Sequence, residues 1–165
     1  MTQQYRRSFG VRATVARPFN HAGPRQNPIF VCSDFGKQFA EIAIKKSPPV
    51  IRVGNLDTKR DFTDVRDVVR AYWAMFEGKA DDGVYNVCSG RAVQIRDIIS
   101  TLQEISGLDL SIIAEEKRRR TYEVPLVVGS FEKLNRDTGW QPSVPLRKTL
   151  EDVFEYWQRE VSRQG

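Results

Sequence analysis

Short β-prone runs alternate with amphipathic helical segments along this chain, and this alternation constrains the fold more than any other feature. Strands are predicted at Val11–Ala16, Val50–Val53, Val84–Cys88 and Leu110–Ile113. Helices are predicted at Ile29–Lys46, after an N-cap at Thr63 or Asp64, at Ile95–Ile105, shortly before Gly139 and from Pro145 onward. Because strands alternate with helices, the pattern favours an α/β architecture of packed layers.

The first residues predict an unusual entry into this architecture. Tyr5–Gly10 has the pattern of the last turn of a helix closed by a C-cap glycine, and it leads directly into the strand at Val11–Ala16. This order is expected inside a βαβ unit, so we expect the strand to need sheet neighbours that the chain does not supply. Such an edge is expected to self-associate. The Gly- and Pro-rich residues Asn20–Pro28 are predicted to form a loop.

Composition limits the class of protein. The 165 residues are 40% hydrophobic and 28% charged, as in one soluble domain or slightly more. No run approaches the ~18 apolar residues of a membrane span, and the polar start after Met1 does not resemble a signal peptide, so a cytoplasmic location is expected. Cys32, Cys88 and the single histidine, His21, lack the spacing of a zinc site. Both cysteines are therefore predicted to be buried thiols, and no metal is expected.

The net charge of +5 predicts attraction to an anionic partner. Much of the excess lies in Lys117–Arg120, a run that would attract nucleic acid, membrane headgroups or a nucleotide diphosphate alike. An alternative function is therefore a basic binding module for nucleic acid or an acidic partner. The chain has no nucleic-acid motif with interleaved exposed aromatic residues.

The aromatic residues favour core positions over a base-stacking surface. Trp73, Trp140 and Trp157 are all assigned to the core, because they lie at helical spacing or in the Gly-Trp-Pro corner. The helix after Asp64 is strongly amphipathic and carries an apolar set made of Val65, Val68, Val69, Tyr72, Trp73 and Phe76.

Five motifs occur in a fixed order along the chain. They are Arg17-Pro18-Phe19-Asn20-His21, Val53–Leu56 leading to Lys59–Asp67, Tyr85–Gly90, Arg120–Pro125 and Thr138–Pro142. In this order they resemble the C-terminal half of an extended short-chain dehydrogenase/reductase, in the NAD-dependent epimerase/dehydratase family. The chain is most similar to the GDP-mannose branch, which covers the 4,6-dehydratases and the GDP-4-keto-6-deoxymannose reductases. The stretches Phe62–Asp67 and Tyr85–Gly90 look more like the reductases.

The resemblance implies a single truncated unit over residues 1–165, in two parts. Residues 1–24 and 62–92 are expected to be remnants of a Rossmann domain with an incomplete sheet. Residues 25–61 and 93–165 are expected to form a small substrate-binding α/β portion for a sugar nucleotide.

Four residues match positions that the resemblance implies for substrate binding: Asn20, Arg60, Arg120 and Glu123. A guanidinium binds phosphate oxygens in bidentate fashion, which suits Arg60 and Arg120 to a diphosphate. Glu123 is expected to accept hydrogen bonds from ribose hydroxyls or to orient Arg120. An alternative for Arg60 is a surface ion pair with Asp57 or Asp61.

The basic run Lys117–Arg120 leaves open which of its arginines contacts the ligand. An alternative for Arg120 is a solvated position within its run, where Arg118 and Arg119 are expected to face solvent. Because the register is uncertain, either of these two could take its place. Lys37 could touch a phosphate, but this is the weaker interpretation.

The cofactor side of the resemblance is incomplete. Pro18, His21 and Arg25 match cofactor-contacting positions, and intact relatives are expected to use NAD or NADP. The chain contains neither a Gly-rich cofactor loop nor a Tyr with a Lys four residues later, the pair in which the lysine would lower the pKa of the phenol. We therefore expect no catalytic residue and no cofactor bound by this chain alone. The predicted function is the substrate-binding half of a GDP-mannose-type reductase or dehydratase, with a GDP-sugar as ligand and a second copy or a missing N-terminal half as partner.

Overall fold

The computed structural model describes residues 2–11, 13–80, 83–118 and 122–163. Its elements are, in chain order, α1 (Thr2–Phe9), β1 (Thr14–Pro18), β2 (Asn20–Ala22), α2 (Val31–Ala43), β3 (Val50–Val53), β4 (Lys59–Asp64), α3 (Val65–Ala74), the π-helical turn η1 (Met75–Lys79), β5 (Gly83–Val87), β6 (Ala92–Gln94), α4 (Ile95–Ser106), β7 (Ser111–Ala114), the 3-10 turn η2 (Glu116–Arg118), β8 (Leu126–Val127), α5 (Glu132–Thr138) and α6 (Leu146–Arg163).

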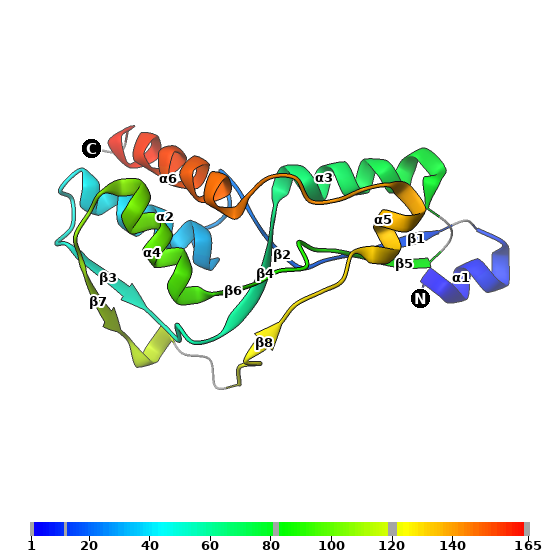
Figure 1. The fold of residues 1–165 in the computed structure, drawn as a ribbon, viewed down its shortest axis with the longest axis horizontal. Helices are drawn as coiled ribbons and strands as arrows, with labels where there is room; N and C mark the ends of the chain where they lie inside the picture. Colours follow the sequence, from blue (N-terminus) through cyan, green and yellow to red (C-terminus); the bar gives the residue numbers. More distant parts are fainter. Residues whose placement is uncertain (1, 12, 81–82, 119–121, 164–165) are drawn as a thin grey trace.

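Parallel strand pairs connect segments that are distant in the sequence. Among the described residues, β1 pairs with β5, β2 with β4, and β3 with β7, all in parallel. Strand β4 also pairs with β6, antiparallel, and with β8, parallel. Figure 1 shows β4 running through the middle of the molecule, with α2, α4 and α6 at one end and α1, α3 and α5 at the other. These alternating helices and parallel strands confirm the predicted α/β fold class.

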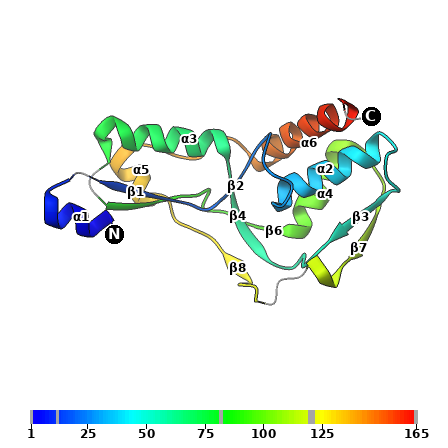
Figure 2. The same ribbon diagram turned by 180° about the vertical axis from the view of Figure 1, so that it is seen from behind.

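The larger hydrophobic cluster lies at the end that contains α2, α4 and α6. These three helices pack against one another and over β3, and α6 lies along α2 in both Figure 1 and Figure 2. Phe39, Ile51, Ile98, Leu102 and Leu150 are fully buried within this cluster. Their positions follow from the helical spacing of apolar residues, which places one face of each helix toward the others.

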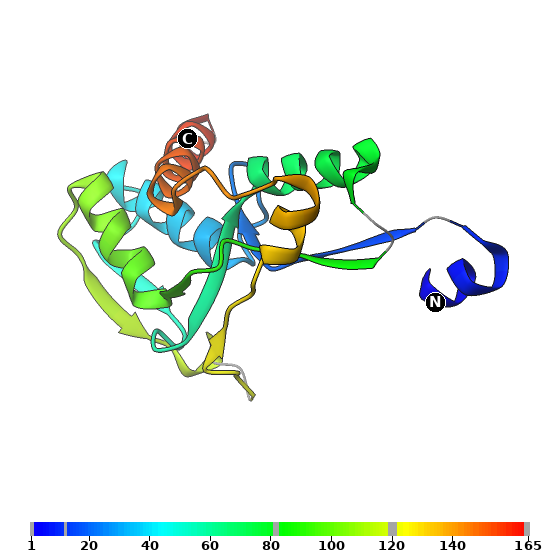
Figure 3. The same cartoon turned by 45° about the vertical axis from the view of Figure 1, so that its right-hand side comes forward.

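A second cluster lies at the other end of the molecule. It joins α3 to β5 and α5 through Val68, Ala71, Tyr85, Leu134 and Trp140. Figure 3 shows β1 and β5 extending away from the rest of the molecule as a two-stranded ribbon, with α1 beyond its end. The predicted division into Rossmann and substrate-binding portions stays a prediction. Leu134 and Trp140, which that division assigns to the substrate-binding portion, pack in this second cluster with α3 and β5.

A buried carboxylate on β4 joins two distant segments to that strand. Asp61 accepts hydrogen bonds from the backbone nitrogens of Ser89 (2.8 Å), Gly90 (3.0 Å) and Gly129 (3.2 Å). Its side chain is fully buried, so these donors replace the water that a carboxylate would otherwise require. The contacts fix the turn after β5 and the residues that precede α5 against β4.

Two further carboxylates at the start of α3 hold the approach to α6. Asp64 is the N-cap of α3, accepting from the Arg66 nitrogen at 2.8 Å, and it also accepts from the Thr149 hydroxyl at 2.7 Å. Asp67 accepts from the nitrogens of Ser143 and Val144, both at 2.9 Å. The segment that leads into α6 is therefore tied to α3 by side-chain hydrogen bonds to its backbone.

Several sequence predictions agree with the structure. Strand β3 coincides with the predicted Val50–Val53, and Asp64 caps α3 as one of the two predicted candidates. Helix α4 ends at Gly107, whose φ of 66° is the left-handed C-cap conformation expected of glycine there. Cys32 and Cys88 are buried thiols, as predicted.

Three predictions about local structure were wrong. Val69, Tyr72, Trp73 and Phe76 are 42–80% exposed, because Val68 and Ala71 form the buried face of α3. Part of the predicted loop, Asn20–Ala22, is strand β2, since it pairs with the end of β4. The first strand begins at Thr14 rather than Val11.

No helix within the described ranges is long and apolar enough to cross a membrane.

Stability should fall in acid because of the carboxylates around α3. Burial alone would raise the pKa of Asp67, but hydrogen bonds from Arg70, Val144 and Ser143 outweigh it and hold the pKa below its usual range. A carboxyl group whose pKa is lower in the folded than in the unfolded state stabilises the folded protein at pH values above its unfolded-state pKa of about 3.9. This stabilisation is lost as the pH falls through the folded-state pKa. We expect the free energy of unfolding to drop below about pH 4.

The variant Asp67→Asn should lower the free energy of unfolding at pH 7 by about 2 kcal/mol and flatten its fall below about pH 4. Urea denaturation at a series of pH values measures both effects. Asp57→Asn is the matched control, because the Asp57 side chain is 80% exposed and pairs only at the surface with Arg96. An Asp67→Asn variant as stable as the control at neutral pH would contradict this account.

Candidate functional site

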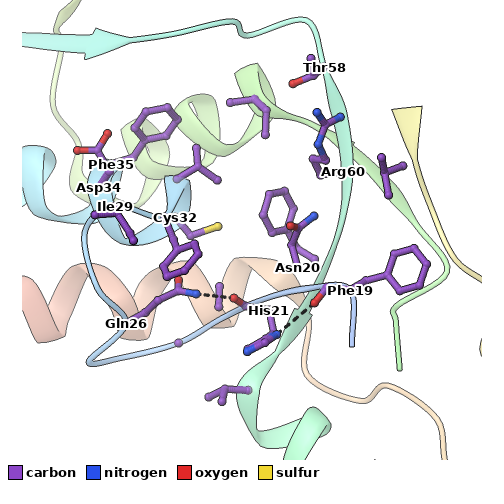
Figure 4. Close-up of a pocket in the computed structure, with 18 of the residues that line it drawn as sticks. Phe19, Asn20, His21, Gln26, Ile29, Cys32, Asp34, Phe35, Thr58 and Arg60 are labelled. Carbon is purple, nitrogen blue, oxygen red and sulfur yellow. Dashed lines mark hydrogen bonds between the residues drawn. The ribbon is translucent and has the colours of Figure 1, made fainter. Parts of the chain in front are cut away.

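A cleft of about 1020 Å³ lies between the first strands, the start of α2, β4 and the segment around η2. Its walls come from four parts of the chain that are far apart in sequence. The lining consists of residues 17–26, 29–32, 34, 35, 54, 55, 58, 60, 62, 65, 95, 118, 123 and 127. Figure 4 shows the Asn20 side chain pointing toward the space between Arg60 on β4 and Phe35 on α2, with Thr58 just before β4 at its edge and the His21 ring on the other side of the chain.

The wall formed by residues 17–26 is held by local hydrogen bonds. The Phe19 nitrogen donates to the Val87 carbonyl at 2.9 Å, which continues the pairing of β1 with β5. Gln26 donates from Nε2 to the His21 carbonyl at 2.6 Å (Figure 4). Because that donor fixes the amide, Gln26 Oε1 is the free end, and it is buried with no hydrogen-bond partner in the described part of the chain.

Asn20 lies at the centre of the cleft, at the start of β2. Its Nδ2 is 3.4 Å from the Asp61 carbonyl, which leaves the side chain only loosely tied to β4. Pro18, the last residue of β1, and Arg25 line the same cleft. Arg25 has a φ of 70°, a left-handed conformation that is uncommon for a non-glycine residue and that turns the chain from β2 toward α2.

Arg60 reaches the cleft from the opposite wall. Its Nη1 donates to the carbonyl of the adjacent Lys59 at 2.9 Å. The two acids considered as surface partners are engaged elsewhere, since Asp57 pairs with Arg96 at 3.6 Å and Asp61 accepts from backbone nitrogens. Within the described residues, the guanidinium of Arg60 is thus available to a ligand.

The wall around η2 contains a second arginine, Arg118, which was expected to face solvent or to take the place of Arg120. Arg118 donates to Asp34 of α2 at 2.7 Å and to Glu115 at 3.1 Å, and it lines the cleft. Its carbonyl lies against Gly54, where a Cβ would be only 2.5 Å from that oxygen. The absence of a side chain at Gly54 therefore permits this close approach. Burial raises the pKa of Asp34, and the charge of Arg118 offsets this only in part.

The remaining predicted substrate residues lie close to this wall. Glu123 lines the cleft and accepts from Asn55 Nδ2 at 2.6 Å. Arg120 falls outside the described residues. Lys37 is not in the cleft lining: it lies 3.8 Å from Glu41 and stacks over the Trp157 ring.

The electrostatic character of the cleft favours an anion. The described lining residues include four arginines, Arg17, Arg25, Arg60 and Arg118, against two acids, Asp34 and Glu123. A concave site with excess positive charge attracts and concentrates anionic ligands. In the described ranges, no group of three or more His, Cys, Asp or Glu side chains is placed to hold a metal ion.

Sequence reasoning identified Pro18, Asn20, His21, Arg25, Arg60 and Glu123, and the structure places all six along one cleft. It missed the lining residues Gln26, Asp34, Asn55 and Thr58. Asn55 lies inside the motif segment Val53–Leu56 and Thr58 lies directly before the segment Lys59–Asp67, so their proximity to Arg60 was the available signal. Asp34 gave no signal, because its partner Arg118 is 84 residues away.

Comparison with solved structures defines the class of protein. The chain superimposes on RMD from Pseudomonas aeruginosa complexed with NADPH, with a TM-score of 0.90 at 34% identity, over 96% of this chain and 52% of that one. It also superimposes on a UDP-glucose 4-epimerase from Thermotoga maritima with UDP-glucose, with a TM-score of 0.84 at 28% identity, over 96% of this chain and 50% of that one. The fold is that of the C-terminal part of a short-chain dehydrogenase/reductase of the epimerase and reductase type.

Within that class, the chain belongs to the GDP-mannose 4,6-dehydratase family, whose model matches residues 1–153. It is 37% identical over 152 residues to a GDP-6-deoxy-D-mannose reductase of P. aeruginosa, covering 92% of this chain and 50% of that protein. It is 27% identical over 169 residues to a GDP-mannose 4,6 dehydratase of Drosophila melanogaster, covering 91% and 42%. The chain therefore spans about half the length of the curated relatives that it matches.

Neither cysteine should act as a nucleophile. Burial raises the pKa of Cys32, which lines the cleft, to about 12, and burial followed by the charge of Asp61 raises the pKa of Cys88 to about 11. At pH 8 almost no thiolate is present, so we expect Ellman's reagent to react with the folded chain at least ~100-fold more slowly than with the chain in urea. Rapid reaction of one thiol equivalent without denaturant would contradict this, and the Cys32→Ser variant would show which thiol is responsible.

Proposed function

We propose that this chain is the substrate-binding half of a GDP-mannose-type reductase or dehydratase, and that its cleft holds a GDP-sugar. The observation that carries the proposal is the meeting of Asn20, Arg60 and Glu123, from three distant segments, along one positively charged cleft. A sugar nucleotide offers this cleft a diphosphate, ribose hydroxyls and a polar sugar. The names of its relatives, a GDP-6-deoxy-D-mannose reductase and GDP-mannose 4,6-dehydratases, support guanosine as the nucleoside.

Each proposed ligand contact has a chemical reason. Arg60, whose guanidinium is not engaged by a described carboxylate, would bind the diphosphate in bidentate fashion. Arg120 keeps the role that the motif implies for it at the diphosphate or ribose. Glu123 would accept from ribose hydroxyls, and the loosely held amide of Asn20 would donate to and accept from the sugar or a phosphate.

We propose that the cleft contains only part of a cofactor-binding site. A solved relative holds NADPH and an epimerase relative holds NAD. Pro18, His21 and Arg25 would meet such a dinucleotide at its nicotinamide and phosphate, and the unpaired acceptor Gln26 Oε1 beside His21 fits a carboxamide N–H donor. When bound, the dinucleotide supplies hydride chemistry. We propose that this chain alone binds none, since it has no Gly-rich loop to hold the pyrophosphate.

The chain's own contribution to a reaction would then be to hold and orient the substrate. A part of a protein that holds the reacting group in place raises the reaction rate even when it contributes no catalytic residue. The Gly-rich loop and the Tyr–Lys pair would come from a missing N-terminal half or a second polypeptide, because a second copy of this chain would lack them as well. The exposed apolar face of α3 and the second edge of β1 support such a partner, because both are surfaces that sheet and helix neighbours normally cover.

Calorimetric titration with GDP-mannose tests the proposal directly. We expect binding that is selective over UDP-glucose and NADPH, and that weakens by about tenfold or more in Arg60→Ala, because a charge-assisted phosphate contact is lost. Arg96→Ala is the matched control, since Arg96 pairs with Asp57 at the surface and is not in the cleft lining. Absence of binding to GDP-mannose, or equal binding to all three ligands, would refute the proposed specificity.

Catalytic activity should be absent. When the purified chain is mixed with GDP-4-keto-6-deoxymannose and NADPH, we expect no decrease in NADPH absorbance above the uncatalysed rate, because no Tyr and Lys four residues apart are present to transfer the proton. An intact GDP-6-deoxy-D-mannose reductase serves as the positive control. Turnover at a comparable rate would overturn the proposal that this chain is a binding half.

The alternative of a basic binding module has less support. Within Lys117–Arg120, the described residues Lys117 and Arg118 both pair with Glu115, and Arg118 also pairs with Asp34. These carboxylates neutralise part of the charge that would otherwise attract nucleic acid. Steeply salt-dependent oligonucleotide binding that GDP does not compete with would favour the alternative.

A further inference from the structure

The side chain of Asn55 is fixed at both ends of its amide group. Its Oδ1 accepts from the Asp57 nitrogen at 2.9 Å, and its Nδ2 donates to Glu123 Oε2 at 2.6 Å. The backbone nitrogen can only donate, and the carboxylate can only accept, so the amide has one orientation that satisfies both partners. Asn55 itself lines the cleft beside Gly54.

The backbone brings the segment that contains Glu123 to Asn55. The Lys59 nitrogen donates to the Pro125 carbonyl at 2.8 Å, and β8 follows in parallel with β4. On the other side, the Glu115 nitrogen donates to the Val53 carbonyl at 2.8 Å. These bonds anchor the main chain on both sides of the turn that contains Asn55. They do not select a rotamer of the long Glu123 side chain, which has three side-chain torsions.

We propose that Asn55 is a positioning residue that holds the Glu123 carboxylate ready for the ribose of the ligand. This inference rests on the proposed function, in which Glu123 accepts from ribose hydroxyls. With Oε2 held by Asn55, Oε1 is the acceptor assigned to the ribose. A charge-assisted hydrogen bond of 2.6 Å is a strong one. It restricts the Glu123 side chain before the ligand arrives, so less conformational entropy is lost on binding.

The experiment compares GDP with 2′,3′-dideoxy-GDP by calorimetry on the full chain. For the unsubstituted protein we expect GDP to bind about tenfold more tightly, because the analogue lacks both ribose hydroxyls. In Asn55→Ala this preference should fall below about threefold, with little change in the affinity for the dideoxy analogue. Asn55→Asp is a second variant of the same shape: it keeps the acceptor for the Asp57 nitrogen but removes the donor to Glu123, so it should lose the preference as well.

A double variant separates positioning from a general structural effect. If Asn55 acts through Glu123, then Asn55→Ala combined with Glu123→Ala should lose no more of the ribose preference than Glu123→Ala alone. The control Asp57→Ala leaves the backbone nitrogen that fixes Asn55 in place, so it should keep the full preference. Melting temperatures show that each variant is folded.

Two results would overturn the inference while leaving the proposed function in place. They are an undiminished ribose preference in both Asn55 variants, and an equal loss of affinity for GDP and its dideoxy analogue. If the unsubstituted chain binds neither nucleotide, the proposed function fails and this inference fails with it.

Discussion

The pairing of buried carboxylates with backbone nitrogens along β4 and the start of α3 is the interaction on which the rest of the structure depends. Asp61, Asp64 and Asp67 lie at three-residue intervals, and each is at most 2% exposed. Each reaches a different segment: the turn after β5, helix α6 and the residues that precede α6. The two hydrophobic clusters are thus joined by hydrogen bonds from one central segment, whose strand β4 also forms one wall of the cleft.

Local patterns in the sequence predicted most elements, and the failures have a common physical cause. Helix α4 and its Gly107 cap follow from spacing and from the conformational freedom of glycine, both of which are local properties. Helix α3 shows the limit of such reasoning. Its periodicity indicates which residues are apolar, but whether Trp73 and Phe76 are covered depends on neighbours that the pattern does not contain. Strand β2 was missed because its formation depends on pairing with β4.

The candidate site was predictable where its residues lie in motifs and unpredictable where it depends on contacts across the fold. Motif positions identified Asn20, Arg60 and Glu123, and these lie along one cleft. Arg118 was expected in solvent or in place of Arg120, and its position beside the cleft follows from Asp34 on α2 and from the space above Gly54, neither of which is a local property. Asn55 belongs to a quoted motif, but its bond to Glu123 spans 68 residues and became visible only in three dimensions.

The exposed apolar face of α3 has a consequence for how this chain can change over generations. Val69, Tyr72 and Trp73 of α3 and Phe76 of the adjoining turn η1 contribute little to the chain's own core, so polar replacements there would cost its folding little and would improve its solubility. Selection for the stability of this chain by itself would therefore not keep them apolar. Polar replacements there would be costly only if another surface covers these residues, so the tolerance of α3 to such replacements measures how far the chain depends on a covering partner.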